Sequence, residues 1–176
     1  LEAVGDFEEA VEAARAAAQL DPLSASFGDM LAHTLAAAGR VAEAREEIDR
    51  TLEMHPRFRS AIETSGWIHV RQGNLEAALA EFERLPKEAG HEFAGIADRG
   101  FAYARLGRIE EARAMLARLD ERRRRQPDME LDIDYAVVYE GLDDRDKAVE
   151  HLNRAVDRRV GTVVLLGTFS AFADAQ

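Results

Sequence analysis

A short turn occurs four times in this chain, and its spacing constrains the fold more than any other feature. Each copy begins at a glycine, continues with a polar residue, and reaches an alanine five positions after the glycine. The glycines lie 34 residues apart, and so do the alanines; the pairs are Gly5/Ala10, Gly39/Ala44, Gly73/Ala78 and Gly107/Ala112. A period of about 34 residues is typical of stacked helix–turn–helix units. The sequence therefore predicts an all-α fold, a solenoid of antiparallel helical hairpins.

The physical chemistry of the turn explains why these residue types recur. A residue just past a helix end often adopts the left-handed conformation, where a Cβ costs about 1–2 kcal/mol and glycine costs little. Acidic residues such as Glu43 and Glu76 then fall in the first turn of the next helix, where the helix dipole favours them. The alanine is small, which predicts that the two helices of a hairpin approach closely there.

The period divides the chain into about four full repeats, preceded by a partial one. Pro22 and Pro56 lie 34 residues apart and end helices, and we expect Pro86 to end a third helix early. Ala148 follows Ala112 by 36 residues, so the last repeat has two extra residues, and its turn is predicted at Gly141-Leu142-Asp143-Asp144. The predicted boundaries are 1–22, about 23–56, 57–90, 91–126 and 129–160, with residues 161–176 as an apolar C-terminal capping segment.

Within the predicted helices, apolar positions indicate the buried faces. Residues 6–20 are predicted to be helical, and the helix over 23–38 is expected to turn Phe27 and Met30 inward. Gly66 and Gly100 lie 34 residues apart in the middle of predicted helices, where glycine costs about 1 kcal/mol relative to alanine. We expect close helix–helix approach at both.

Composition excludes several classes of site and of binding partner. The 176 residues include no cysteine, which excludes disulfides, thiolate metal sites and cysteine nucleophiles, and which fits a cytoplasmic protein. The net charge of −11 disfavours binding to nucleic acid or to an anionic membrane. No signal peptide is visible, and the apolar stretch 161–172 is too short to span a bilayer. The chain opens without a methionine and in mid-repeat, so we expect a segment of a longer protein.

The chain resembles the tetratricopeptide repeat family over nearly all of its length. The resemblance rests on the second helices, through Gly39/Ala44/Ile48/Pro56, Gly73/Ala78/Phe82 and Gly107/Ala112/Leu116, and on Gly66 with His69 and Gly100 with Tyr103. It departs from the family where a large aromatic is preferred near the start of the first helix; here stand Gly28, Ile62, Ile96 and Asp132. The resemblance implies a right-handed superhelix whose first helices line a concave groove that binds peptide segments of other proteins.

Residues 139–148 are also similar to the final repeat of bacterial multidomain signalling proteins, in which such repeats are attached to kinase, cyclase or regulator domains.

By the family's geometry, the groove residues lie on the first helix of each repeat. The residues at those positions here are Asp29, His33, Glu63, Trp67, Val70, Arg71, Phe101, Arg105, Val137 and Glu140. Trp67 and Phe101 occupy equivalent positions, as do Arg71 and Arg105, and aromatics and arginines dominate binding hot spots. An extended peptide with apolar side chains and an acidic group would suit them. The alternative is that the two rings pack between repeats and that the arginines are solvated. Acidic Asp29 and Glu63 argue against a clamp for a chaperone's acidic tail.

Two further charged stretches have a functional and a structural interpretation. The run from Arg122 to Arg125 is either a patch for anionic partners or a solvated helix C-terminus, and we favour the second. Asp132-Ile133-Asp134 is either a metal pair or, as we expect, a solvated acidic helix start. The histidines show no metal-ligand spacing, and no phosphate loop or nucleophile elbow occurs.

These observations predict a non-catalytic protein-interaction scaffold with no cofactor and no metal, whose partner is a protein or peptide. A self-association module, forming a homodimer that brings attached signalling domains together, is the alternative. An enzyme is the third possibility, and no motif supports it.

Overall fold

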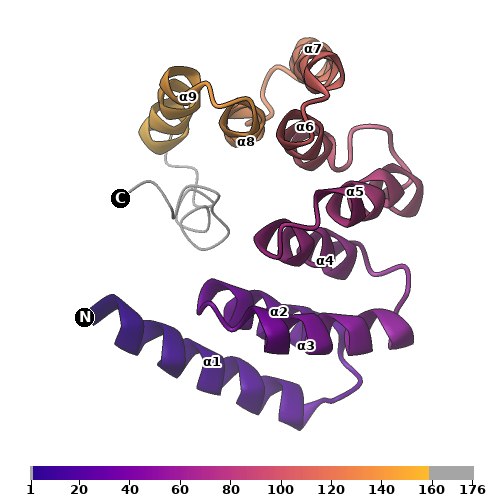
Figure 1. Ribbon diagram of the computed structural model, residues 1–176, viewed down its shortest axis with the longest axis vertical. Helices are drawn as coiled ribbons and strands as arrows, with labels where there is room; N and C mark the ends of the chain where they lie inside the picture. Colours follow the sequence, from indigo (N-terminus) through magenta and orange to yellow (C-terminus); the bar gives the residue numbers. More distant parts are fainter. Residues whose placement is uncertain (1, 159–176) are drawn as a thin grey trace. The chain divides into compact units, whose positions relative to one another are not determined.

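The computed structural model describes residues 2–158 and places them in helices joined by short turns (Figure 1). No strand occurs in that range, so the predicted all-α class is confirmed. The helices are α1 (Glu2–Leu20), α2 (Ala25–Ala37), α3 (Val41–Met54), α4 (Arg59–Arg71), α5 (Leu75–Ala89), α6 (Ile96–Arg105), α7 (Ile109–Arg125), α8 (Asp132–Gly141) and α9 (Arg145–Asp157). The predicted apolar segment 161–176 lies outside the described residues, and the division into repeats stays a prediction.

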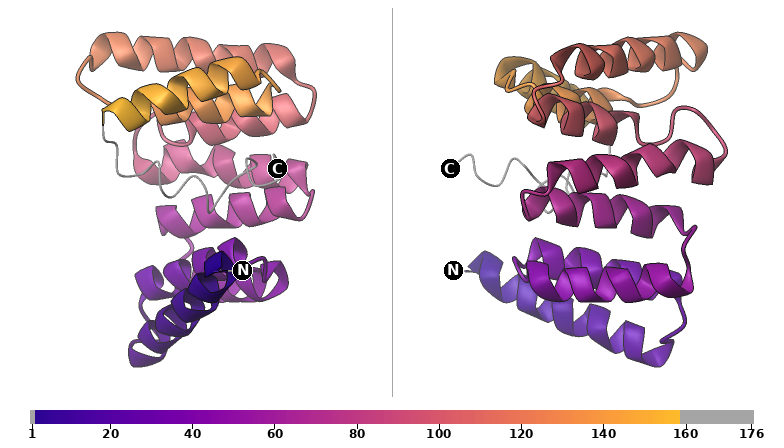
Figure 2. Two further views of the ribbon diagram at one scale, coloured as in Figure 1. Left: turned by 90° about the vertical axis from the view of Figure 1, so that its left-hand side faces the viewer. Right: turned by 45° about the vertical axis from the view of Figure 1, so that its right-hand side comes forward.

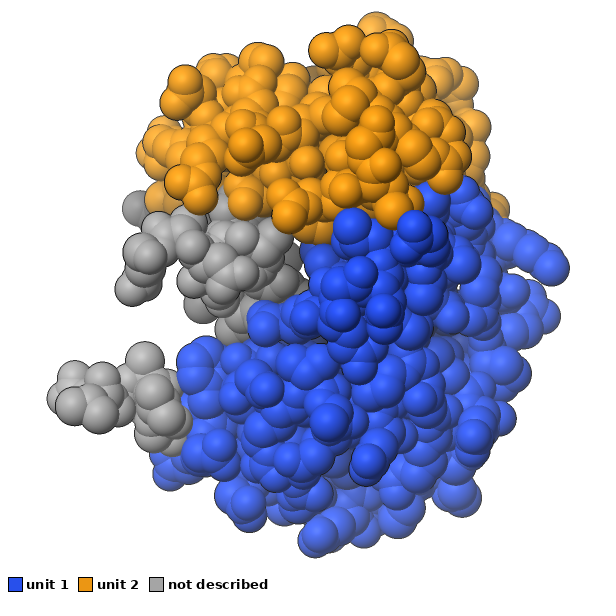
Figure 3. Space-filling view, viewed as in Figure 1, with its two compact units in different colours: residues 1–89 blue, residues 90–176 orange. Residues whose placement is uncertain are grey.

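The chain forms two compact units, residues 1–89 and residues 90–176 (Figure 3). In unit 1, α2 packs on α3 and α4 on α5, with α1 against α2 and α4 against both α2 and α3. In unit 2, α6 packs on α7 and α8 on α9, and α8 also contacts α6 and α7. Figure 2 shows the two helices of each hairpin side by side. Each unit is thus a stack of helical hairpins with its own core.

The predicted glycine turns are present after α2, α4 and α6. Gly39, Gly73 and Gly107 have φ values of 77°, 76° and 75°. The residue after each glycine donates its N–H to a carbonyl in the last turn of the preceding helix, as in Arg40 N to Leu35 O at 2.9 Å and Arg108 N to Tyr103 O at 2.8 Å. This is the Schellman arrangement, which satisfies carbonyls that the helix end would otherwise leave unpaired.

The turn after α8 lies in the predicted stretch, residues 141–144, but aspartate rather than glycine takes its left-handed position. Gly141 is not the turn residue: it is the last residue of α8, and Asp143 takes the left-handed position with a φ of 59°. Asp144 N donates to Tyr139 O at 2.9 Å, which completes the same hydrogen-bond pattern. The two-residue insertion therefore shifts the turn from glycine to aspartate, a residue that tolerates the left-handed region better than most.

Gly141 instead lies where α8 meets α6. A Cβ built on Gly141 would lie 2.8 Å from Phe101 Cα and 3.0 Å from Phe101 O, both backbone atoms. The predicted close approach at the mid-helix glycines is confirmed as well. A Cβ on Gly66 would overlap the Phe82 ring, and one on Gly100 would lie 2.7 Å from Val138 Cγ2. Ala44, Ala78 and Ala112 of the turn motif and Ala148 of the last repeat are buried, as expected of close contacts within hairpins, whereas Ala10 of the first copy is exposed.

Three local predictions are wrong. First, α1 runs from Glu2 through Gly5 without a turn. Second, α5 continues through Pro86 to Ala89. Tertiary contacts hold its last turn: Leu85 is buried, and Glu88 pairs with Arg57 at 2.7 Å.

Third, Phe27 and Met30 do not point inward; 36% and 41% of their surfaces are exposed. Their equivalents 34 residues later, Ala61 and Thr64, are buried. The stripe on α2 is therefore apolar by sequence, but no helix among residues 2–158 covers it as Ala61 and Thr64 are covered on α4.

Substitutions at Gly141 and Asp143 test which residue makes the turn. Gly141→Ala is expected to destabilise the protein by about 1–3 kcal/mol, because its methyl group meets the Phe101 backbone. Asp143→Gly is expected to stabilise it by up to about 1 kcal/mol, because glycine removes the left-handed strain. Urea unfolding of both variants measures these changes. A stabilising Gly141→Ala, the ordinary result in a helix without a close contact, would contradict the α6–α8 packing.

Candidate functional site

The predicted groove residues of unit 1 lie on its two neighbouring first helices. Asp29 and His33 are on α2, and Glu63, Trp67, Val70 and Arg71 are on α4. Ser60 at the start of α4 donates its hydroxyl to Asp29 Oδ2 at 2.5 Å and so ties the two helices together. Burial lowers the pKa of His33; the Asp29 carboxylate opposes this shift and the Arg71 cation adds to it. Asp29, His33 and Arg71 thus form one electrostatically connected group.

Trp67 and Phe101, the predicted aromatic pair, are largely buried. Only 9% of Trp67 is exposed, and its ring centroid lies 5.6 Å from that of Phe82 on α5. Phe101 is 3% exposed, and its backbone lies against Gly141. These positions favour the packing alternative for both rings, which leaves the charged residues as the accessible part of each first-helix face.

In unit 2 the predicted residues lie on α6 and α8. Arg105 is exposed near the end of α6, while Val137 and Glu140 are half-buried on α8. Burial and, to a smaller degree, the charge of Asp143 raise the pKa of Glu140. The cations of Arg145 and Arg105 oppose this shift. Glu140 on α8 therefore interacts electrostatically with Arg105 on α6. In the following first helix, α8, Gly141 stands at the position equivalent to Arg71 and Arg105. Each unit therefore has one arginine at this position.

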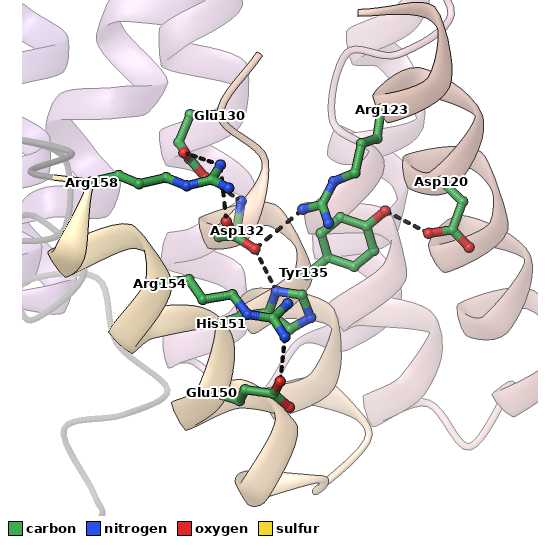
Figure 4. A network of polar contacts seen from close by, with 9 residues as sticks. All are labelled: Asp120, Arg123, Glu130, Asp132, Tyr135, Glu150, His151, Arg154 and Arg158. Atoms are coloured by element: carbon green, nitrogen blue, oxygen red, sulfur yellow. Dashed lines mark hydrogen bonds and ion pairs between the residues drawn. The ribbon is translucent and has the colours of Figure 1, made fainter. Parts of the chain in front are cut away.

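The acidic start of α8 is not solvated, as the sequence analysis expected it to be. Only 1% of Asp132 is exposed, and it stands at the repeat position held by buried Ile62 and Ile96. Its Oδ1 accepts hydrogen bonds from His151 Nδ1 at 2.7 Å and from Arg123 at 3.2 Å (Figure 4). Its Oδ2 has no hydrogen-bond partner and lies 3.6 Å from the guanidinium of Arg158. Asp132 is therefore a buried carboxylate with three partners: Arg123 from α7, His151 from α9, and Arg158, the residue that caps the C-terminus of α9.

Aromatic rings surround this carboxylate. The His151 ring stacks with Tyr135 at 4.8 Å and with Tyr139 at 5.6 Å between centroids. Arg123 lies over the Tyr135 ring at 4.5 Å, and the Tyr135 hydroxyl donates to Asp120 at 2.6 Å (Figure 4). We call Asp132, His151, Arg123, Tyr135 and Arg158 the α8–α9 charge cluster. It joins three helices of unit 2, α7, α8 and α9, through polar contacts.

The pKa of Asp132 follows from these contacts. Burial alone would raise it, but the hydrogen bonds from His151 and Arg123 outweigh burial and hold the pKa below its ordinary value. The carboxylate is therefore ionised in the folded protein at neutral pH. Among the described residues, no group of three or more His, Cys, Asp or Glu side chains is placed to hold a metal ion.

The basic run at the end of α7 is largely engaged within unit 2. Arg123 pairs with Asp132, and Arg125 pairs with Glu92 at 3.1 Å and Glu121 at 2.5 Å. Arg122 and Arg125 also lie over the Phe93 ring, at 5.7 and 5.5 Å. This arrangement agrees with the interpretation of the run as the last turn of a helix rather than as a patch for anionic partners.

Sequence analysis placed Asp134 in a solvated helix start and did not foresee its interaction with Asp98. Burial, together with the charge of Asp98 on α6, raises its pKa to about 6, although Arg122 partly opposes the shift. Asp98 and Asp134 lie 36 residues apart, which is also the spacing between Ala112 and Ala148, so they stand at equivalent positions of successive first helices. This spacing is the sequence signal from which their proximity could have been predicted.

A double-mutant cycle tests the buried pair of the cluster. Asp132→Ile and His151→Met introduce the residues that stand at these positions in the preceding repeat, Ile96 and Met115. Each single substitution is expected to cost about 3 kcal/mol, since it leaves a buried polar partner unsatisfied. The double substitution should return the free energy of unfolding to within about 1 kcal/mol of the parent, because apolar pairs of similar volume replace buried ion pairs well.

Chemical denaturation measures the four proteins of the cycle. Glu150→Gln is the matched control: it removes the exposed pair with Arg154 on the same helix and should change stability by less than about 1 kcal/mol. Additive losses in the double variant would contradict the coupling of Asp132 and His151.

Asp134 predicts a pH dependence with a definite sign. Its folded pKa of about 6 exceeds its ordinary value of 3.8, so the folded state binds the proton more tightly than the unfolded state does. The folded state carries no penalty below pH 3.8; the penalty grows between pH 3.8 and about 6 and keeps its full value at higher pH. Asp134→Asn should therefore stabilise the protein by about 1–2 kcal/mol at pH 8 and have little effect at pH 4. Unfolding curves of parent and variant across this range would contradict the assignment if their difference did not change with pH.

Comparisons with known proteins agree with this architecture. Family profiles described as Tetratricopeptide repeat match residues 30–92 and residues 97–118. A solved tetratricopeptide repeat protein from Parabacteroides merdae superposes with a TM-score of 0.58 and 18% sequence identity, over 93% of this chain and 65% of that one. This chain thus spans about two thirds of the length of its structural neighbour. Comparison with curated proteins gives no match.

Proteins of this family generally act as non-catalytic scaffolds for protein–protein interaction. Among residues 2–158, no helix combines the length and the apolar character needed to cross a membrane. Residues 30–92 and 97–118 are thus similar to tetratricopeptide repeats, and the structural neighbour shows that the chain shares its fold of helical hairpins.

Proposed function

We propose that this chain is a non-catalytic scaffold whose first-helix faces bind a peptide segment of a partner protein. The observation that carries the proposal is the gathering of charged side chains at equivalent positions of first helices, above all Arg71 on α4 and Arg105 on α6. In unit 1 the face comprises Asp29, His33, Glu63 and Arg71, above the buried Trp67 and half-buried Val70. In unit 2 it comprises Arg105, Val137 and Glu140, above the buried Phe101.

The chemistry of these faces defines the ligand. Each face sets one arginine beside at least one carboxylate, so each can contact an acidic and a basic or amide group of one extended peptide. The half-buried valines add apolar surface for the peptide's side chains. Because both faces lie on helices rather than on loops, little ordering entropy is lost on binding. We further propose that the scaffold belongs to a larger bacterial signalling protein and acts in the cytoplasm.

Self-association is a second candidate function, favoured by one observation. An apolar stripe at the start of unit 1 is exposed, with Leu20 at 87%, Leu23 at 71%, Phe27 at 36% and Met30 at 41%. Exposed apolar patches often mark protein interfaces. A dimer by light scattering that dissociates on Leu23→Glu with Phe27→Glu would support this function, and a monomer at all concentrations would exclude it.

Charge reversal tests the peptide-binding faces. Trp67 and Phe101 are poor positions for this test, because truncating a buried ring destabilises the fold by about 3–5 kcal/mol. Arg71→Glu and Arg105→Glu change the accessible charge instead. Each should weaken the binding of peptides selected from a random library by about 10-fold or more, as expected for a hot-spot arginine.

Arg113→Glu provides the matched control, since Arg113 is an exposed arginine on a second helix that pairs only weakly, with Glu110 at 3.0 Å. Circular dichroism and thermal unfolding confirm that all three variants are folded. Equal affinity of the parent and of both first-helix variants for every selected peptide would show that the faces are not the binding surface.

A further inference from the structure

A contact between an arginine and a histidine joins α4 to the hairpin before it. Arg45 on α3 places its Nη1 atom 2.8 Å from His69 Nε2 on α4, and the same nitrogen donates to Ser65 Oγ at 3.2 Å. The Asp49 carboxylate holds the other side of the guanidinium: Arg45 Nε donates to Asp49 Oδ2 at 2.8 Å, and Arg45 Nη2 pairs with Asp49 Oδ1. Arg45 is therefore fixed on α3 and directed towards α4.

The chemistry of this pair determines the state of the imidazole ring. An arginine side chain has only donors and stays charged, so His69 Nε2 accepts the hydrogen bond through its lone pair. The ring is then neutral, with its proton on Nδ1, and this Nδ1 atom is buried without a hydrogen-bond partner. A protonated His69 cannot keep the contact, because two donors and two positive charges would meet.

The charged groups around His69 come from α3 and α5. Burial and the Arg45 cation lower the pKa of His69, whereas Glu81 on α5 and Asp49 on α3 oppose the shift. Glu81 also pairs with Arg84 at 2.5 Å. Helix α2, which packs on α4 as well, contributes none of these groups. A positive charge on His69 is therefore repelled by Arg45 and attracted towards Glu81, on the helix with which α4 forms its own hairpin.

The repeat register shows that this chemistry is particular to unit 1. The residues equivalent to His69 on the other first helices are Leu35 on α2, Tyr103 on α6 and Tyr139 on α8. Leucine does not titrate, and tyrosine titrates near pH 10. Of these four positions, His69 alone holds a side chain whose charge changes near neutral pH.

The position of His69 along α4 determines what the contact holds. A second polar contact lies at the start of the helix, where Ser60 donates to Asp29 on α2. Between the two, Ile68 is fully buried in the core of unit 1. Losing the His69 contact would therefore free the last turn of α4, which carries Arg71, and leave the start of the helix in place.

We propose that uptake of a proton from solvent by His69 breaks its contact with Arg45 and releases the last turn of α4 from α3. The stacking of the two hairpins of unit 1 is thereby sensitive to acid. This property stands without peptide binding. If the first-helix faces bind peptides as proposed above, acid would also move Arg71 away from its place on the face, and this one consequence rests on that function.

The effect of pH has a definite sign. Because the pKa of His69 in the folded protein lies below the ordinary value of 6.5, the unfolded state binds the proton more tightly. Stability is fully present above pH 6.5 and is lost as pH falls from there through the folded pKa. Burial lowers the pKa of His33 too, which acts in the same direction, so the parent must be compared with variants at the His69 contact alone.

Amide hydrogen exchange between about pH 5 and 8 tests the proposal on the full chain. His69→Tyr and Arg45→Leu introduce residues that the chain uses at equivalent positions, Tyr103 and Leu79. In the parent, the opening constant of the last turn of α4 should rise by up to about tenfold per pH unit below 6.5, as uptake of one proton requires. His69→Tyr should remove this dependence and Arg45→Leu should reduce it.

His91→Gln is the matched control, because His91 is an exposed histidine, and it should leave the pH dependence as in the parent. Ring-proton resonances of His69 followed by NMR give an independent readout, with an expected midpoint below pH 6.5. A midpoint at or above 6.5 would overturn the proposal. So would an opening constant of the last turn that does not change with pH in the parent, or that changes equally in the parent and in both contact variants.

Discussion

Helices in both units approach one another closely, and small residues at fixed positions allow them to do so. Ala44, Ala78, Ala112 and Ala148 are buried inside hairpins. Gly66, Gly100 and Gly141 stand where a Cβ would meet a neighbouring ring, side chain or backbone. The left-handed turns determine where each hairpin reverses, and these contacts then determine how closely its helices pack. The charged first-helix faces are positioned by this packing rather than by loops of their own.

Much of the fold could be predicted from the sequence, because the period marks where each hairpin turns. Three of the predicted glycine turns are present, at Gly39, Gly73 and Gly107. The errors arose where one residue type can serve two purposes. Gly141 suits a turn by composition, but serves as a helix contact because the insertion moved the turn by two residues. Pro86 suits a helix end, but buried Leu85 and the Glu88–Arg57 pair keep the helix intact.

The candidate site could be predicted less well, because burial depends on residues far away in the sequence. The positions of Trp67 and Phe101 on first helices followed from the repeat, but not their packing against Phe82 and near Gly141. Asp132 looked solvated because its partners, Arg123 and His151, come from other helices. The usable signal was its register: Asp132 stands at the position of Ile62 and Ile96, where a carboxylate requires partners that no local pattern reveals.

The α8–α9 charge cluster also bears on how the repeat array could change in evolution. Repeat proteins grow and shrink by duplicating or deleting whole hairpins, which works when neighbouring interfaces are interchangeable. The hairpin of α8 and α9 is not interchangeable with the others. Its Asp132 requires an arginine from the hairpin before it and a histidine from its own second helix. Placed after α5, it would face Pro86 to Ala89 rather than the arginines that end α7, and its carboxylate would lose Arg123. The cluster therefore restricts this hairpin to one position in the order of repeats, directly after α7.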